Sequence, residues 1–277
     1  MKNAIALGTF DGLHKGHLAV LNMPDCYNKI ALTFEKPPKA VITGVDESIM
    51  PFNEKANRLV KMGITPEKLN FEKVCNIEAQ DFLERVKKEY NPAFISCGFN
   101  FRFGKGGLGD TDLLTDFCRK NNIELQICAP VTVDDITVSS SIIRKHLKNG
   151  EIALANALLS EPFSFKGEVT HGDGRGKTLG FPTVNLTYPK DLVPLKFGVY
   201  KTKVLIENKS YDGITDIGNR PTYPLDFVIS ETFIKDFSGD LYGKVLTITP
   251  VEFLREEKKF NSPQELTEQI KKDLEYI

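Results

Sequence analysis

Two histidines lie three residues apart near the start of the chain, in the segment Gly8-Thr-Phe-Asp-Gly-Leu-His-Lys-Gly-His17. Residues three apart on a helix share a face, so the side chains of His14 and His17 are predicted to point the same way, and Gly16 leaves the backbone between them open. A strand-to-helix turn also presents free amide groups and the positive end of a helix dipole, which suit a phosphate. Either histidine alone would more often be a cap or a surface group. The pair together predicts hydrogen bonds that strengthen as charge builds on a phosphoryl group.

A second set of phosphate-binding groups is predicted in Val138-Ser-Ser-Ser-Ile-Ile-Arg144, where a short helix should begin. At least one of the serines is expected to be a plain helix cap. Arg144 falls in the first turn, so hydroxyls, free amides and a guanidinium group would converge there. That combination suits the phosphates of a nucleotide.

The loop Gly98-Phe-Asn-Phe-Arg-Phe-Gly-Lys-Gly-Gly107 follows a predicted buried strand and alternates aromatic with polar residues. One interpretation is a glycine-rich surface loop whose aromatic rings are tucked inward. The other is a platform on which Phe99, Phe101 and Phe103 pack a flat ring while polar groups hold its edge. The sequence leaves both open.

The second half of the chain carries a glycine-rich basic segment that ends in two oxygen-bearing side chains. Glycines around a basic pair would let backbone amides approach phosphates, although ordinary hairpin glycines would look the same. Thr183 and Asn185 are two apart on an extended chain, so they face one side and offer oxygens to a hard cation such as Mg²⁺. The predicted nucleotide contacts are Gly172, Gly174, Arg175, Lys177, Thr183 and Asn185, the last two also being the predicted metal ligands.

Glu231 shares one face of a predicted strand with Ile229 and Phe233. A carboxylate between apolar neighbours is costly to bury unless it has a task or a partner. It is either an exposed strand-edge residue or a general base that takes a proton from a hydroxyl attacking a γ-phosphate.

The first half of the chain resembles the amino-terminal module of prokaryotic FAD synthetases, through the GxFDGxHxGH form of the nucleotidyltransferase HxGH signature and the two loops described above. The match runs over most of residues 1–160. It implies that a phosphate attacks the α-phosphate of a nucleotide and that pyrophosphate leaves without a covalent enzyme intermediate. The implied catalytic residues are His14, His17 and Arg144; the implied nucleotide contacts are Gly8, Thr9, Phe10, Asp11, Gly16, Ser140 and Ser141; and the implied flavin contacts are Phe99, Asn100 and Phe101.

Three positions depart from the pattern of that family. Asn100 stands where the family usually has Asp, Ile142 where it often has Arg, and residues 35–38 read Glu-Lys-Pro-Pro where Pro-His-Pro is common. Asparagine keeps hydrogen bonding but loses a negative charge. Slower adenylylation or altered flavin binding is the expected consequence.

Residues 163–277 resemble riboflavin kinase, through the GDGRGKTLGFPTVN run, Ile217-Gly-Asn-Arg-Pro-Thr222, Asp240-Leu-Tyr-Gly243 and the LREEKKF run. The resemblance implies a six-stranded barrel, with Thr183 and Asn185 on Mg²⁺ and ATP and Glu231 as base. Arg255 is expected either to reach the flavin or the nucleotide, with the flavin as the assigned contact, or to form only a salt bridge on the surface; the sequence leaves both open.

Composition limits the class of protein. With 277 residues the chain is long enough for two domains, and 36 basic against 37 acidic residues lack the excess that a general nucleic-acid or membrane-surface binder needs. Five widely spaced cysteines without a C-x-x-C pair suggest neither a disulfide framework nor a zinc site. No apolar stretch resembles a signal sequence or a membrane span. A cytoplasmic protein is expected.

The predicted elements place these groups at strand ends. Apolar runs at 4–7, 29–35 and 93–98, with 69–74 and 123–129, predict strands, and helices are expected at 54–62, 81–90, 110–120 and 151–160. Alternating strands and helices imply a parallel sheet with ligands beyond the carboxyl ends of its strands. After about residue 161, short β-type runs predict an antiparallel barrel, and a capping box at Ser262–Glu265 starts a final helix.

The fold prediction is therefore an α/β, Rossmann-like nucleotidyltransferase domain (residues 1–160) followed by a six-stranded antiparallel β-barrel riboflavin kinase domain (161–277) with a C-terminal helix. The functional prediction is conversion of riboflavin to FMN and of FMN to FAD, with ATP as co-substrate and Mg²⁺ at both sites. One alternative is a nucleotidyltransferase for another phosphate ester, with the barrel as a binding module. The other is a riboflavin kinase or flavin-binding protein whose adenylyltransferase domain is weakened or inactive. The oligomeric state is left open.

Overall fold

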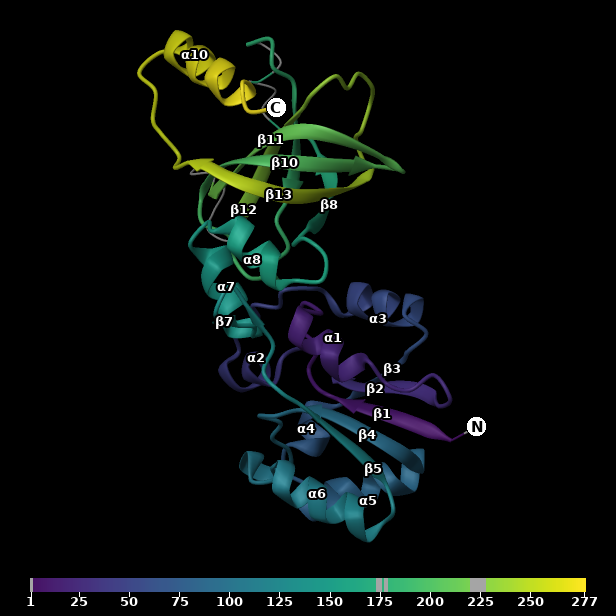
Figure 1. Ribbon diagram of the computed structural model, residues 1–277. Coiled ribbons are helices and arrows are strands. Elements are labelled where there is room, and N and C mark those ends of the chain that lie inside the picture. Colours follow the sequence, from purple (N-terminus) through teal and green to yellow (C-terminus); the bar gives the residue numbers. More distant parts are fainter. Residues whose placement is uncertain (1, 173–175, 177–178, 220–227) are drawn as a thin grey trace. The chain divides into compact units, whose positions relative to one another are not determined.

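The computed structural model of the protein describes residues 2–172, 176, 179–219 and 228–277 (Figure 1). The chain forms two compact units: unit 1 is Met1–Ser140 with Leu158–Glu161, and unit 2 is Ser141–Ala157 with Pro162–Ile277. Residues 141–157 thus group with the barrel, and the division at residues 160 and 161 stays a prediction.

Unit 1 is built on a five-stranded parallel sheet with the order β3-β2-β1-β4-β5. Its strands are β1 (Asn3–Leu7), β2 (Asn28–Phe34), β3 (Thr65–Leu69), β4 (Pro92–Gly98) and β5 (Glu124–Cys128), with a two-stranded hairpin of β6 (Thr132–Val133) and β7 (Ile136–Thr137). Its helices are α1 (Lys15–Leu21), α2 (Pro38–Thr43), α3 (Phe52–Lys61), α4 (Phe71–Val74), α5 (Ala79–Tyr90), η1 (Lys105–Gly107) and α6 (Thr111–Lys120). The parallel sheet, its strand order and the helices between its strands confirm the predicted Rossmann-like class.

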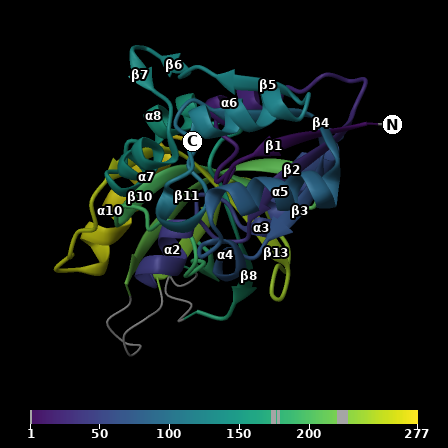
Figure 2. The same ribbon diagram turned by 90° about the horizontal axis from the view of Figure 1, so that it is seen from below.

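The central strand β1 is buried on both faces, as a near-continuous apolar run predicts. Ala4 and Ala6 pack with residues of α1 and α3 in one core, whereas Ile5 and Leu7 pack with residues of α5 and α6 in the other. Figure 2 looks at the second face and shows α5 and α6 lying across the strands. The alternation of β1 therefore places small residues toward the helix that carries the histidines.

The strand predicted at 69–74 is wrong. The strand is β3, which ends at Leu69, and the next residues form the short helix α4. Asn70 caps that helix, because its side chain accepts a hydrogen bond from the backbone amide of Lys73 at 3.2 Å. β3 lies at the edge of the sheet, where Pro66 can be accommodated without losing a ladder hydrogen bond.

Unit 2 contains a closed barrel with the strand order β10-β11-β12-β9-β8-β13, all pairs antiparallel. Its elements are α7 (Ser140–Lys148, which begins in unit 1), α8 (Ile152–Leu158), β8 (Phe165–Thr170), β9 (Thr183–Thr187), β10 (Gly198–Ile206), β11 (Lys209–Asn219), β12 (Val228–Ile234), β13 (Val245–Arg255) and α10 (Pro263–Leu274). The six-stranded barrel and the C-terminal helix agree with the prediction.

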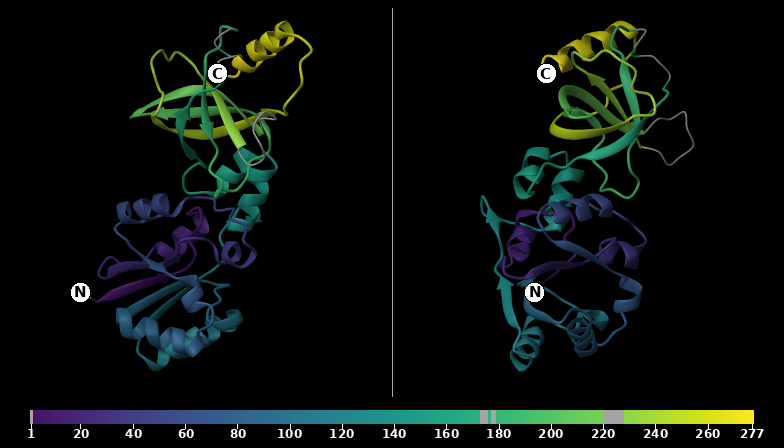
Figure 3. Two further views of the ribbon diagram at one scale, coloured as in Figure 1. Left: turned by 180° about the vertical axis from the view of Figure 1, so that it is seen from behind. Right: turned by 90° about the vertical axis from the view of Figure 1, so that its right-hand side faces the viewer.

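Two helices of unit 2 are attached to the barrel by polar side chains. On α8, the Asn156 amide donates to the carbonyl of Pro250 at 3.4 Å and accepts from the amide of Phe163 at 2.8 Å. α10 lies beside the barrel in both views of Figure 3 and begins at the predicted Ser262 cap.

Throughout the described part of the chain, no helix combines the length and the apolar character needed to cross a membrane.

Candidate active sites

The turn between β1 and α1 brings the two histidines face to face. His14 is the N-cap of α1, and its Nδ1 accepts a hydrogen bond from the backbone amide of His17 at 3.2 Å. The two rings stack with centroids 3.4 Å apart and planes 17° from parallel. The prediction that both imidazoles point the same way is confirmed. His14 does act as a cap, and the cap fixes its ring against that of His17.

The same turn has an unusual backbone. Phe10 and Leu13 have φ values of 51° and 44°, and Gly12 has 80°. Left-handed conformations at residues with a side chain cost about 1–3 kcal/mol each and cluster at functional sites. A Cβ on Gly8 would lie 2.9 Å from the Phe10 ring, so glycine is required there. The Phe10 ring in turn meets the His17 ring edge-on, with centroids 5.4 Å apart.

Asp11 connects this turn to later segments. Its buried carboxylate accepts the amides of Ile49 and Met50 at 2.9 and 3.4 Å, and its backbone carbonyl accepts the hydroxyl of Ser140 at 3.1 Å. The side chains of Asp11 and Phe10 are buried, so they shape the turn from within. Nucleotide contacts from Gly8, Thr9, Phe10, Asp11, Gly16 and Ser140 stay predictions, as do those of Ser141 and Arg144, which belong to unit 2.

The aromatic loop after β4 divides into an inner and an outer part. Phe103 is buried against Phe82, and Phe101 stacks on Phe103 with centroids 5.4 Å apart. Phe99 is 47% exposed, and Asn100 is exposed beside it. Two of the three rings are thus tucked inward, whereas Phe99 and Asn100 are among the exposed residues of the loop. The flavin contacts of Phe99, Asn100 and Phe101 stay predictions.

In unit 2, the barrel register gathers the predicted kinase residues. Thr183 Oγ1 on β9 donates to Glu231 Oε1 on β12 at 2.6 Å, and Asn185 lies directly opposite Glu231 in the ladder. Asn185 is only 8% exposed. A hydroxyl, an amide and a carboxylate thus lie on neighbouring strands at one place.

Two glycines of the glycine-rich basic segment approach these side chains closely. A Cβ on Gly172 would lie 2.2 Å from Asn185 Nδ2, and one on Gly176 would lie 2.4 Å from the carbonyl oxygen of Phe181 and 3.0 Å from Thr183 Oγ1. Ordinary hairpin glycines do not require such contacts, which favours the functional interpretation. Gly174, Arg175 and Lys177 lie outside the described residues.

Replacing Gly172 with Ala is expected to raise the KM for ATP at least tenfold in the kinase reaction that the resemblance predicts for this half of the chain. The added methyl group cannot fit beside Asn185, so either that amide or the backbone at Gly172 must move. The measurement is FMN formation at varied ATP, with FAD formation from supplied FMN as the control. An unchanged KM for ATP would show that the contact between Gly172 and Asn185 has no part in nucleotide binding.

The sequence analysis did not single out Asp216, which lies opposite Glu231 on the neighbouring strand β11. Asp216 on β11 pairs with Glu231, and on its other side with Val199, which pairs with Arg255. Asp216 is exposed to solvent, but partial desolvation by the surrounding protein, followed by the charges of Glu257 and Glu231, raises its pKa to about 6, against an opposing effect of Arg255. Only the pairing of β11 with β12 and β10 shows that Asp216 lies beside Glu231 and is separated from Arg255 by one strand.

Arg255 itself is bound to α10. Its guanidinium group donates to both carboxylate oxygens of Asp273, with Nη2 to Oδ2 at 2.7 Å and Nε to Oδ1 at 3.0 Å. Asp273 is 4% exposed. The salt-bridge alternative is therefore present, and a flavin contact of Arg255 stays a prediction.

Replacing Asp216 with Asn is expected to stabilise the barrel in a pH-dependent way. Since the folded pKa lies above the ordinary 3.8, the native state binds more protons than the unfolded state between these values, and stability falls as pH rises toward 6. The gain in Tm should be small at pH 4.5 and reach a plateau above pH 6. Asp212→Asn on the same strand is the control, because Lys203 lowers the Asp212 pKa and its contribution should be complete by pH 4.5. A gain independent of pH would contradict the assignment.

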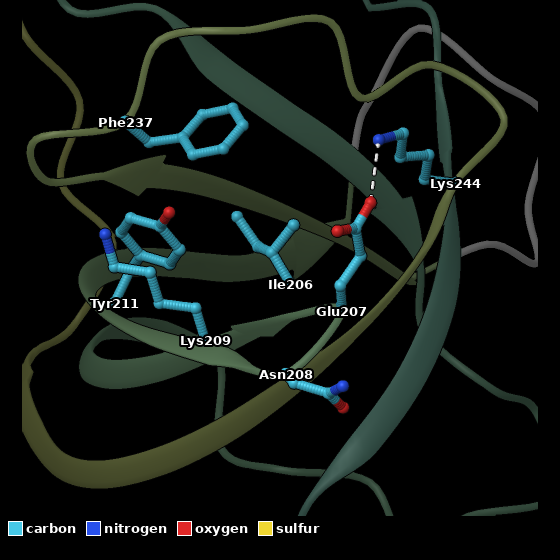
Figure 4. A pocket seen from close by; sticks show the side chains of 7 residues that line it. All are labelled: Ile206, Glu207, Asn208, Lys209, Tyr211, Phe237 and Lys244. Carbon is cyan, nitrogen blue, oxygen red and sulfur yellow. Dashed lines mark hydrogen bonds and ion pairs between the residues drawn. The ribbon is translucent and has the colours of Figure 1, made fainter.

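A separate pocket of about 420 Å³ lies at the hairpin between β10 and β11 (Figure 4). The rings of Tyr211 and Phe237 meet edge-on there, 5.4 Å apart, and Lys244 pairs with Glu207 at 3.3 Å. The lining residues are Ile206, Glu207, Asn208, Lys209, Tyr211, Phe237 and Lys244. None of the predicted site residues lines it.

Comparisons with known proteins agree with the two-site organisation. The family model described as FAD synthetase matches residues 1–142, and the one described as Riboflavin kinase matches residues 159–277. The chain is 33% identical to the bifunctional riboflavin kinase/FMN adenylyltransferase of Bacillus subtilis, over 98% of this chain and 90% of that protein. It is 30% identical to the protein of the same name from Escherichia coli, over 97% of this chain and 90% of the relative.

A solved structure has the same architecture. The crystal structure described as a macrolide-efflux protein from Streptococcus pneumoniae superimposes with a TM-score of 0.89 at 27% identity, covering 99% of this chain and 93% of that one. The relatives and the family matches cover both halves of the chain. It therefore belongs to the bifunctional riboflavin kinase/FMN adenylyltransferase family of transferases, whose two reactions make FMN from riboflavin and FAD from FMN.

Proposed function

We propose that this chain carries out both reactions of its family, and that riboflavin is phosphorylated at the β9–β12 site of unit 2. The observation that carries the kinase assignment is the 2.6 Å hydrogen bond between Thr183 and Glu231 beside the closely approached Asn185. A carboxylate held in this way can take the proton of the riboflavin 5′-hydroxyl as its oxygen attacks the γ-phosphate of ATP. Glu231 is the general base in this proposal.

The side chains present fit a magnesium ion. Mg²⁺ prefers hard oxygen donors, and in phosphoryl-transfer sites it is held by few protein groups together with substrate phosphates. Thr183 and Asn185 offer a hydroxyl and an amide oxygen beside the Glu231 carboxylate. Within the described ranges no group of three or more His, Cys, Asp or Glu side chains could hold a metal by itself. A bound Mg²⁺ would neutralise phosphate charge, and Thr183 and Asn185 would hold it.

We further propose that FMN is adenylylated at the β1–α1 turn of unit 1. An FMN phosphate oxygen forms a bond to the α-phosphorus of ATP while the bond from that phosphorus to the bridging oxygen of pyrophosphate breaks. Because His14 Nδ1 accepts the His17 amide, a neutral His14 carries its proton on Nε2 and can donate it in a hydrogen bond. The stacked imidazoles can thus stabilise charge that develops during transfer.

Incubation of the protein with riboflavin, ATP and Mg²⁺ tests both assignments in one vessel. FMN should appear first and FAD and pyrophosphate later, separated by chromatography. A nucleotidyltransferase for another phosphate ester would form no FMN from riboflavin. The absence of FMN from the reaction would therefore exclude the kinase assignment.

A second candidate function is a riboflavin kinase with a weakened adenylyltransferase site, and the exposed Asn100 beside Phe99 favours it. FMN formation without FAD would support that candidate. Asn100→Asp restores the charge usual in the family and provides the matched comparison. Faster FAD formation by Asn100→Asp than by the natural chain would show that the loop limits adenylylation.

A further inference from the structure

A lysine that the sequence motifs do not include is buried beneath the β1–α1 turn. Lys55 lies on α3, and the whole residue is 2% exposed. Its Nζ donates to the carbonyl oxygen of Phe34 at 2.7 Å, to that of Thr9 at 2.9 Å and to Thr33 Oγ1 at 3.2 Å. An ammonium group has three N–H donors, so all three are used.

These hydrogen bonds join the ends of two neighbouring strands. Thr9 follows β1, whereas Thr33 and Phe34 end β2. The Thr33 hydroxyl also donates to the Thr9 carbonyl at 2.7 Å, so this oxygen receives two donors. The site lies where ligands of parallel sheets bind, beyond the carboxyl ends of the strands.

The anchored carbonyl immediately precedes the left-handed residue Phe10. Such a conformation persists only where the surroundings over-determine it. Phe10 then meets the His17 ring edge-on, and His17 stacks on His14. A continuous set of contacts thus runs from Lys55 through Thr9 and Phe10 to the His17 imidazole.

We propose that Lys55 is a positioning residue for adenylyl transfer: it holds the Thr9–Phe10 backbone in the conformation that orients His17. The inference rests on the proposed function of the turn. Placing a charged amine out of water is costly, and a purely apolar side chain would fill the same space without that cost. The charge is retained because it fixes a strained backbone that an apolar residue could not hold.

The elements around Lys55 carry several charged groups. Asp11 in the β1–α1 turn is the charged group that acts on Lys55, while Glu54 is paired with Arg58 on α3 and Glu35 with Lys68 at the ends of β2 and β3. Burial lowers the Lys55 pKa to about 8, while Asp11 opposes the shift. A neutral amine keeps only two N–H donors for three acceptors. Adenylyl transfer by the natural chain should therefore decline above pH 8.

The test is a double-mutant cycle in the full chain between Lys55→Met and His17→Ala. Met has a similar length without N–H donors, and Lys55→Met should lower kcat for FAD formation at least tenfold while riboflavin phosphorylation is unchanged. Because Lys55 acts through His17, the double variant should be no slower than His17→Ala. Lys61→Met, at the exposed end of the same helix, is the control and should match the natural chain.

The remaining outcomes distinguish a failure of the Lys55 inference from a failure of the proposed function of the turn. Multiplied effects in the double variant, or a folded Lys55→Met with kcat within twofold of the natural chain, would overturn the inference. If Lys55→Met does not fold, Thr33→Val replaces it in the cycle, since it removes one of the two donors to Thr9, and multiplied effects there would equally overturn it. If His17→Ala itself retains full activity, the proposed function of the turn fails instead.

Discussion

Glu231→Gln is expected to lower kcat for riboflavin phosphorylation by about 10²–10⁴-fold, the range that general acid–base catalysis typically contributes. Glutamine keeps the size of the side chain and an oxygen that can accept the Thr183 hydroxyl, but it cannot take a proton from the riboflavin 5′-hydroxyl. Conversion of supplied FMN to FAD should be unchanged, because that reaction is assigned to unit 1. FMN and FAD formation are measured separately by chromatography.

The matched control is Glu252→Gln on β13. Glu252 is an exposed strand glutamate of the same barrel, so its replacement removes an equal charge without touching the β9–β12 site. Its kinase activity should equal that of the natural chain. Full kinase activity of Glu231→Gln would remove this residue from the role of base. An equal loss in both variants would point to net charge as the cause.

His17→Ala is expected to reduce FAD formation from FMN by about 10²–10³-fold, the typical effect of losing one preorganised donor at a transition state. Riboflavin phosphorylation by the same variant should be retained. His17 is the better choice for this test, because His14 also caps α1 and its loss would add about 1 kcal/mol of helix destabilisation. The measurement is pyrophosphate release with FMN and ATP as substrates.

Lys15→Ala is the control for the histidine variant. Lys15 lies between the two histidines in the motif and is exposed at the first position of α1. Its replacement should leave FAD formation close to that of the natural chain. If His17→Ala formed FAD at the normal rate, the opening motif would be structural and adenylylation would have to take place elsewhere.

Local sequence signals predicted most elements, because buried strands and amphipathic helices leave strong periodic patterns. β1, β4, α5 and α6 all lie where expected. The segment after Gly63 differs from the predicted strand at 69–74, because a proline in an edge strand and a four-residue helix capped by Asn70 produce no clear period. The hairpin of β6 and β7 is too short to leave a signal of its own.

The sequence could not predict the surroundings of residues that depend on burial in the core or on the register of paired strands. Lys55 occupies an ordinary position in an amphipathic helix, and only the ends of β1 and β2 show that its ammonium group is buried on three oxygens. Asp216 follows no motif of its own, and it becomes a neighbour of Glu231 through the antiparallel pairing of β11 with β12. Both signals exist only after the chain has folded.

The sequence by itself was enough to predict the two reactions of the family and the residues assigned to them. The spacing of His14 and His17 and the oxygen-bearing pair of Thr183 and Asn185 are local features, and short-range geometry decides which way neighbouring side chains face. The tertiary structure decided which distant residues meet. Glu231 reaches Thr183 across 48 residues because the barrel closes β9 against β12, and Lys55 reaches Thr9 across 46 residues because α3 packs on the sheet. Such contacts depend on strand order and packing depth, which no local pattern of residues encodes.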